Sequence, residues 1–222
     1  MARFRRAFSS SVGTKLLIGL TGLLLFAYLV LHLAGNAIVF AGPDIFNEYS
    51  HRLVSNPLII PAEIGLLLIF VVHVYKAGRN WLHNRDARPV GYERKEYARH
   101  TSRKSFASST MIVSGLITLL FVIVHVKQFK YGAWYQTAGD DAIRDLYRTE
   151  LEVFAQPAWV IFYMVCTAIV GLHLRHGIAS GFQSLGFDHP LYTKRLTAVS
   201  ILLALVIGGG LALIPLLVFL RL

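Results

Sequence analysis

Five long apolar segments alternate with polar connections along this chain, and this pattern predicts its fold. Each segment reaches or approaches the roughly 20 residues that a helix needs to cross the hydrocarbon of a bilayer. Backbone polar groups inside lipid must be bonded within their own segment, so the spans are predicted as helices. We predict an all-α integral membrane protein, a five-transmembrane-helix bundle forming a single membrane domain over residues 1–222. The predicted helices lie near 15–41, 57–80, 105–130, 157–182 and 194–220.

Charge predicts how the bundle is oriented. The formal net charge is +10, and the basic residues lie mostly between the apolar segments. Sixteen of the 22 Lys and Arg residues fall in the N-terminus and the second and fourth connections, and six fall on the other side. The positive-inside rule then predicts a cytoplasmic N-terminus and an external C-terminus. We expect a multi-pass protein in contact with membrane lipid, in a bacterial inner (cytoplasmic) membrane, and no nucleic-acid binding.

The third connection and the single cysteine refine this prediction. The run DDAIRDLYRTELE in the third connection predicts a short external helix. Cys166 is the only cysteine, which excludes a four-thiolate iron–sulfur site and a CxxCH haem attachment in this chain. Histidine, with nine copies, is the remaining candidate ligand for a redox cofactor.

Each of the first four apolar segments carries one histidine in its C-terminal part. Because successive segments cross in opposite directions, the first and third histidines share a depth near the external face. We name these two, His32 and His125, the outer pair. The second and fourth, His73 and His173, share a depth near the cytoplasmic face and form the inner pair. Histidine within a span is expensive and usually functional. Two facing imidazoles are axial ligands for a low-spin haem, so we predict two haem b groups and an electron path across the bilayer.

Small residues accompany these histidines. Thr21 with Gly22, and Ser114 with Gly115, lie ten or eleven residues before the outer-pair histidine of the same helix. Eleven residues return to nearly the same helical face about 16 Å away along the axis. These positions therefore lie at the depth of the other haem, where a macrocycle needs space.

The four histidines have other possible roles. They can form interhelical hydrogen bonds or line a proton path, whereas zinc or copper needs three or four ligands at one depth. His176, one turn beyond His173, is an alternative ligand, and depth favours His173. The remaining histidines fall in connections and are expected to be solvated: His51, His83, His100 and His189.

Taken together, the motifs resemble a known family. They are SSSVGTKLLIGLTG leading into HLAGN, FVVHVYKAGRNW, NRDARPVGY, SGLITLLFVIVHVKQFKYG, DLYRTELEVFAQP and HLRHGIASGFQSLGF, in this order. Over nearly the whole chain they resemble the five-helix dihaem cytochrome b membrane anchors of succinate:quinone and quinol:fumarate oxidoreductases, the complex II family. In that family a ligand histidine is followed four residues later by glycine, which fits His173 with Gly177.

The resemblance implies a function. The chain would be the membrane-anchor cytochrome b subunit of succinate dehydrogenase, and the succinate or fumarate site would lie on a partner subunit. Its partners would be a flavoprotein subunit holding FAD and an iron–sulfur subunit holding iron–sulfur clusters. The two b haems would carry electrons between the iron–sulfur subunit and a membrane quinone, with menaquinone favoured.

The quinone site has several candidates. Glu63, near the outer start of the second helix, is a possible quinone-site proton group, although an acid there also complements a positive helix terminus. Glu48 and His51 are alternatives. Some family members carry a glutamate two residues before the fourth-helix ligand, where this chain has Gly171. That departure leaves the corresponding proton route in doubt and favours succinate oxidation over fumarate reduction.

Two other functions compete. A dihaem cytochrome b anchor of another quinone-linked oxidoreductase, such as a nitrate reductase, formate dehydrogenase or hydrogenase, shares the four-histidine pattern. The HLAGN and HLRHG contexts argue against it. A haem-free transporter or assembly protein is the second rival, but a transporter is expected to show broken helices or an inverted repeat. The sequence shows neither.

Overall fold

A computed structural model describes residues 10–87, 106–139 and 142–221, and every regular element within those ranges is a helix. Five of the helices are long and apolar enough to cross a membrane, which confirms the predicted all-α, five-span architecture. They are α2 (Ser11–Ala37, continued by the 3-10 helix η1, Ile38–Ala41), α4 (Ile59–Asp86), α6 (Met111–Phe129), α8 (Pro157–Ser184) and α9 (Thr193–Arg221). The chain is a multi-pass membrane protein on this evidence.

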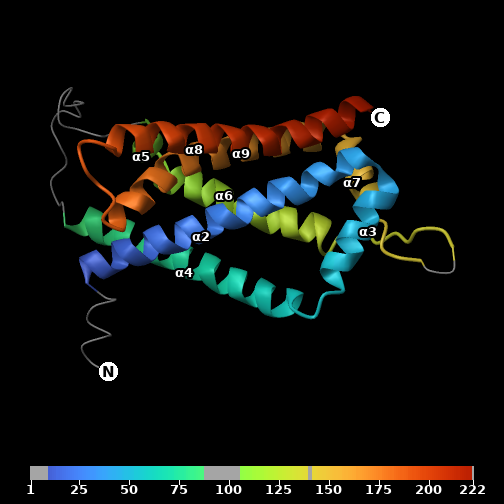
Figure 1. Cartoon of the computed structure of the whole chain (residues 1–222), viewed down its shortest axis with the longest axis horizontal. Helices are drawn as coiled ribbons and strands as arrows, with labels where there is room; N and C mark the ends of the chain where they lie inside the picture. The colour runs from blue at the N-terminus through green and yellow to red at the C-terminus, as the bar shows by residue number, and fades with distance from the viewer. Residues whose placement is uncertain (1–9, 88–105, 140–141, 222) are drawn as a thin grey trace.

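Three short helices lie between the spans: α3 (Pro43–Val54), α5 (Phe106–Ser109) and α7 (Leu146–Phe154). α7 is the short helix predicted in the third connection, and α3 was not predicted. Figure 1 shows α3 and α7 together at the end of the bundle where α9 finishes. α2 begins at the opposite end. Which end faces the cytoplasm remains a prediction.

Two helix boundaries differ from those predicted. α4 continues to Asp86 instead of ending near residue 80, because its last turns are polar and hydropathy marks only the apolar part of a helix. The third span is split into α5 and α6 at Thr110. There the hydroxyls of Ser109 and Thr110 donate to the Phe106 carbonyl, each at 2.9 Å. Such local side-chain bonds compete with regular helix hydrogen bonding.

The tightest packing joins α8 to α9, which lie side by side along one flank (Figure 1). Glycine permits this approach, because a Cβ added at Gly208 would lie 2.7 Å from the Gly171 Cα. Gly171 is equally restricted, since its own Cβ would meet the Ala204 carbonyl and the Gly208 Cα at 3.3 Å. Backbone therefore closes this position, where some members of the family that the sequence resembles carry a glutamate.

The buried core is uneven. α8 and α9 each bury eight residues, whereas α4 buries none. In Figure 1, α4 lies on the flank opposite α9, with α2 between them. α4 is therefore the least buried of the five long helices in the described chain.

Candidate functional site

The structure brings the outer pair together. His32 of α2 and His125 of α6 have ring centroids 5.6 Å apart, with planes nearly perpendicular at 88°. Both lie toward the C-terminal ends of their helices, as the apolar pattern predicts. Metal–nitrogen bonds are about 2 Å long, so two imidazoles at this separation can reach one metal ion.

The inner histidines are each held by a hydroxyl from another helix. His73 of α4 has its Nδ1 3.1 Å from the Thr21 Oγ1 of α2. His173 of α8 has its Nδ1 3.1 Å from the Ser114 Oγ of α6. The two imidazoles are also near enough for a charge on one to act on the other. The same contact is thus built twice, by helices from the two halves of the chain.

The hydroxyl protons indicate which imidazole nitrogen is free. The Thr21 hydroxyl donates to the Leu17 carbonyl at 2.6 Å, and the Ser114 hydroxyl donates to the Met111 carbonyl at 3.1 Å. Each hydroxyl oxygen is therefore left to accept a hydrogen bond from Nδ1–H of its histidine. A neutral imidazole protonated at Nδ1 carries its lone pair on Nε2. This second-sphere arrangement is the one that orients a metal-ligating histidine.

The neighbouring glycines give the inner imidazoles room. A Cβ at Gly22 would lie 3.1 Å from the His73 Cε1, and a Cβ at Gly115 would lie 3.2 Å from the His173 Cε1. The threonine–glycine and serine–glycine pairs do lie at the depth of the inner site. Their direct contact is with the imidazoles, a role that the spacing alone did not indicate.

The outer site has a different set of neighbours. Tyr28 stacks on His32 with ring centroids 5.4 Å apart, and its hydroxyl lies 3.4 Å from the His32 Nδ1. Phe121 occupies the matching place on α6, four residues before His125, and has no hydroxyl to offer. The His125 Nδ1 is buried and has no hydrogen-bond partner among the described residues. A buried polar atom of this kind requires a partner or an explanation.

These residues fit two haems of the bis-histidine type. Within the described ranges, no three His, Cys, Asp or Glu side chains gather as a metal site. A bis-histidine haem needs only two protein ligands, and α4, which buries no residue, has apolar surface that a macrocycle could cover. The Nε2 atoms of His73 and His173, left free when Thr21 and Ser114 accept from Nδ1–H, are the nitrogens that would hold such a group.

The remaining histidines lie as follows. His176 is half-buried beside His173 and stays the alternative inner ligand. His51, His83 and His189 are exposed, as expected, although His51 belongs to α3 and His83 to the last turn of α4. His100 lies outside the described residues.

Glu63 is placed near the outer site but is not free. Its carboxylate forms an ion pair with Lys130 at 2.5 Å, and both side chains are about half exposed. Its charge acts on the Tyr28 phenol, which contacts His32. The first turn of α4 contains no acid, so Glu63 lies beyond the reach of the helix terminus. The alternative Glu48 is exposed and paired with Arg52 at 2.5 Å.

Sequence reasoning missed a buried carboxyl on α7. Glu150 is only 4% exposed, and burial alone raises its pKa from 4.5 to about 8. Two residues later, Glu152 is exposed, bonds the Tyr135 phenol and the Arg148 guanidinium, and has a lowered pKa. The residue pattern of α7 offered no signal, since both acids lie in one amphipathic run.

The fold and the site define a helical multi-pass membrane protein with two histidine pairs at different depths. The chain matches no protein-family model, no curated protein and no solved structure. The resemblance to complex II anchors therefore rests on the motifs quoted above and remains a prediction.

Proposed function

We propose that this chain is the membrane-anchor cytochrome b subunit of a succinate:quinone oxidoreductase. The outer pair, His32 and His125, would hold one b haem, and the inner pair, His73 and His173, would hold the other. The observation that carries the proposal is the repeated contact between a hydroxyl and an inner imidazole. It leaves Nε2 of both inner histidines available at a common site.

The chain's own residues have distinct tasks in this proposal. Thr21 and Ser114 hold the tautomer and the ring orientation of the inner ligands, because their own protons are engaged by backbone carbonyls. Tyr28 supports His32 in the outer pair. Apolar helix faces would exclude water from both sites. Haem, when bound, supplies one-electron transfer, and the protein tunes it through ligands and hydrogen bonds.

Quinone chemistry and the partner subunits complete the proposal. Glu63 would exchange protons with the quinone, and its ion pair with Lys130 would hold the carboxylate near Tyr28. The C-terminal end of α4 carries the exposed bases Arg79 and Arg85. If this end is cytoplasmic, as the charge pattern predicts, they would face the iron–sulfur subunit. The flavoprotein, its FAD and the succinate site would belong to the partner subunits, and menaquinone is the favoured electron acceptor.

The first test is haem content. A pyridine haemochromogen spectrum of the detergent-purified chain, with whatever co-purifies, should give two b haems per chain. His73→Ala should remove one haem, whereas His51→Ala, an exposed matched control, should retain both. No haem in a well-folded wild-type preparation would refute the cofactor assignment. Two haems without succinate-dependent reduction or a co-purifying flavoprotein would favour an anchor of another quinone-linked oxidoreductase.

A finer test addresses the hydroxyl. Thr21→Val keeps the side-chain shape but removes the acceptor of His73 Nδ1–H, so haem affinity at the inner site should fall about 10- to 100-fold. Thr118→Val is the control, because the Thr118 hydroxyl bonds the Ser114 carbonyl of its own helix. Equal haem retention in both variants would contradict the proposed role of Thr21.

A further inference from the structure

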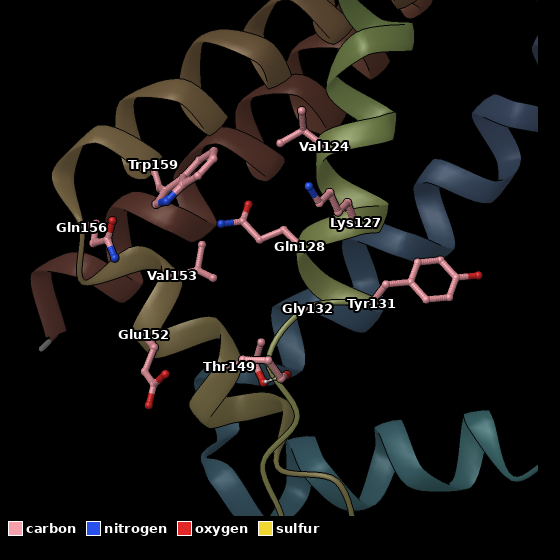
Figure 2. Close-up of a pocket in the computed structure, with 11 residues that line it drawn as sticks. Val124, Lys127, Gln128, Tyr131, Gly132, Thr149, Glu152, Val153, Gln156 and Trp159 are labelled. Carbon is pink, nitrogen blue, oxygen red and sulfur yellow. Dashed lines mark hydrogen bonds between the residues drawn. The ribbon is translucent and has the colours of Figure 1, made fainter.

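A cavity of about 550 Å³ lies between the C-terminal end of α6, the helix α7 and the start of α8 (Figure 2). Its apolar wall includes Val124, Val153 and the indole of Trp159. Gln128 extends into it from α6, facing Trp159 across the space. The volume falls within the range of about 300–1,000 Å³ typical of small-molecule sites. No α4 residue lines this cavity, so it is separate from Glu63.

The Gln128 amide has a defined orientation in this cavity. Its Oε1 accepts a hydrogen bond from the Tyr163 hydroxyl at 2.8 Å, so the carbonyl side of the amide is engaged. Tyr163 is only 4% exposed and packs edge-on against Phe154, which fixes the donor. The amide nitrogen of Gln128 is directed into the cavity in Figure 2. The Gln128 amide therefore offers N–H donors to a hydrogen-bond acceptor bound in the cavity.

The cavity is also adjacent to the outer histidine pair. Val124 and Gln128 lie one residue before and three residues after His125 on α6. The Tyr163 ring, which orients Gln128, lies 6.0 Å from the His125 ring. A molecule bound in the cavity would be separated from the outer site by a single layer of side chains.

We propose that this cavity binds the carbonyl-bearing ring of the membrane quinone, with the Gln128 amide donating to a carbonyl oxygen and Trp159 packing against the ring. The inference rests on the proposed function for the identity of the ligand. Quinone carbonyls accept hydrogen bonds and do not donate them, which matches a wall whose oriented amide offers donors. A planar ring matches the apolar and aromatic surface opposite. Glu63 of α4 does not line the cavity, so proton exchange between Glu63 and the bound ring would pass through an intervening group or water.

The test uses two ring compounds that differ in their carbonyl groups. Menadione, a naphthoquinone, and methylnaphthalene, the same ring system without carbonyls, are titrated into the detergent-purified chain by isothermal calorimetry. Gln128→Met keeps an apolar side chain of similar length and removes the donor. It should weaken menadione binding about tenfold, the loss of one hydrogen bond, and leave methylnaphthalene binding unchanged. Gln183→Met, at the other end of α8, is the matched control and should bind menadione as the wild type does.

A second variant protects the test against a folding defect in the first. Val124→Phe fills the cavity without removing a hydrogen bond, and it should weaken both compounds. Menadione affinity that is unchanged in Gln128→Met and in Val124→Phe would overturn the proposal, as would equal loss of both compounds in Gln128→Met. Haem content is measured on the same samples. If the chain holds two haems but menadione binding does not depend on Gln128, only the cavity assignment is refuted. If menadione binding depends on Gln128 but the chain holds no haem, only the haem assignment is refuted.

Discussion

Replacing Glu150 by glutamine should change how the stability of this protein depends on pH. In the folded chain the Glu150 carboxyl is buried, and desolvation raises its pKa to about 8. Among the described residues, none donates a hydrogen bond to the carboxyl or forms an ion pair with it. α7 packs against α8, and the Tyr163 phenol of α8 interacts with the charge of Glu150.

The size of the effect follows from the two pKa values. In the unfolded chain Glu150 should ionise near its ordinary value of 4.5, so between pH 4.5 and about 8 the folded state binds more protons. Stability from this group is fully present below pH 4.5 and is lost as the pH rises toward 8. The difference corresponds to about 5 kcal/mol. For a chain of this size that is roughly 10 to 20 °C in melting temperature.

The assay is thermal unfolding in detergent, followed by far-ultraviolet circular dichroism from about pH 5 to about pH 9. Glu150→Gln resembles the protonated acid, so it should melt with the wild type at the acidic end and well above it at the alkaline end. Glu152→Gln serves as a control two residues away on the same helix, where the exposed carboxylate has a lowered pKa. If Glu150→Gln follows the wild-type pH profile throughout, the buried and unpaired state of Glu150 is refuted.

Three further predictions concern packing and the outer site. Gly208→Ala should destabilise the α8–α9 contact by about 1–3 kcal/mol, whereas Gly209→Ala, whose Cβ would meet nothing within 4 Å, should be tolerated; melting temperatures in detergent decide this. Asn47→Ala removes two hydrogen bonds from a 2% exposed side chain to the start of α7, so it should cost about 1–3 kcal/mol by the same measurement. Tyr28→Phe removes the hydroxyl beside His32 and should shift the redox potential of one haem only; identical potentiometric titrations of variant and wild type would contradict this.

Hydropathy was sufficient to predict the five spans, because a helix in lipid is specified by its own composition and length. The common depth of His32 and His125 also followed from position along the helices, and the structure places their rings in contact. Contacts that depend on helix rotation were harder to foresee. Thr21 was expected beside a macrocycle, which stays a prediction. Its contact with His73 was not foreseen, because the relative rotation of α2 and α4 is not encoded in either segment alone.

The local pattern of apolar and polar residues gave the least information about α3 and α7, at one end of the bundle. α3 was missed because its twelve residues are amphipathic and do not form a continuous apolar segment of the kind that marks a span. Its buried Asn47 is recognised only through the two bonds that it makes to α7. Glu150 and Glu152 have opposite environments although they are the same residue type on one helix. Burial there is decided by tertiary packing, which no local pattern specifies.

Because of the repeated hydroxyl contact, α2 and α6 each contribute a side chain to both histidine sites. α2 supplies His32 to the outer pair and Thr21 to the inner histidine of α4, and α6 repeats this arrangement. On each helix the hydroxyl residue and the outer histidine are eleven residues apart, so the rise of the helix sets the spacing of the two sites at about 16 Å. Inserting one residue between Thr21 and His32 would rotate one end by about 100° relative to the other. No single rotation of α2 would then satisfy both sites, so the length of this stretch is as constrained as the identity of the histidine itself.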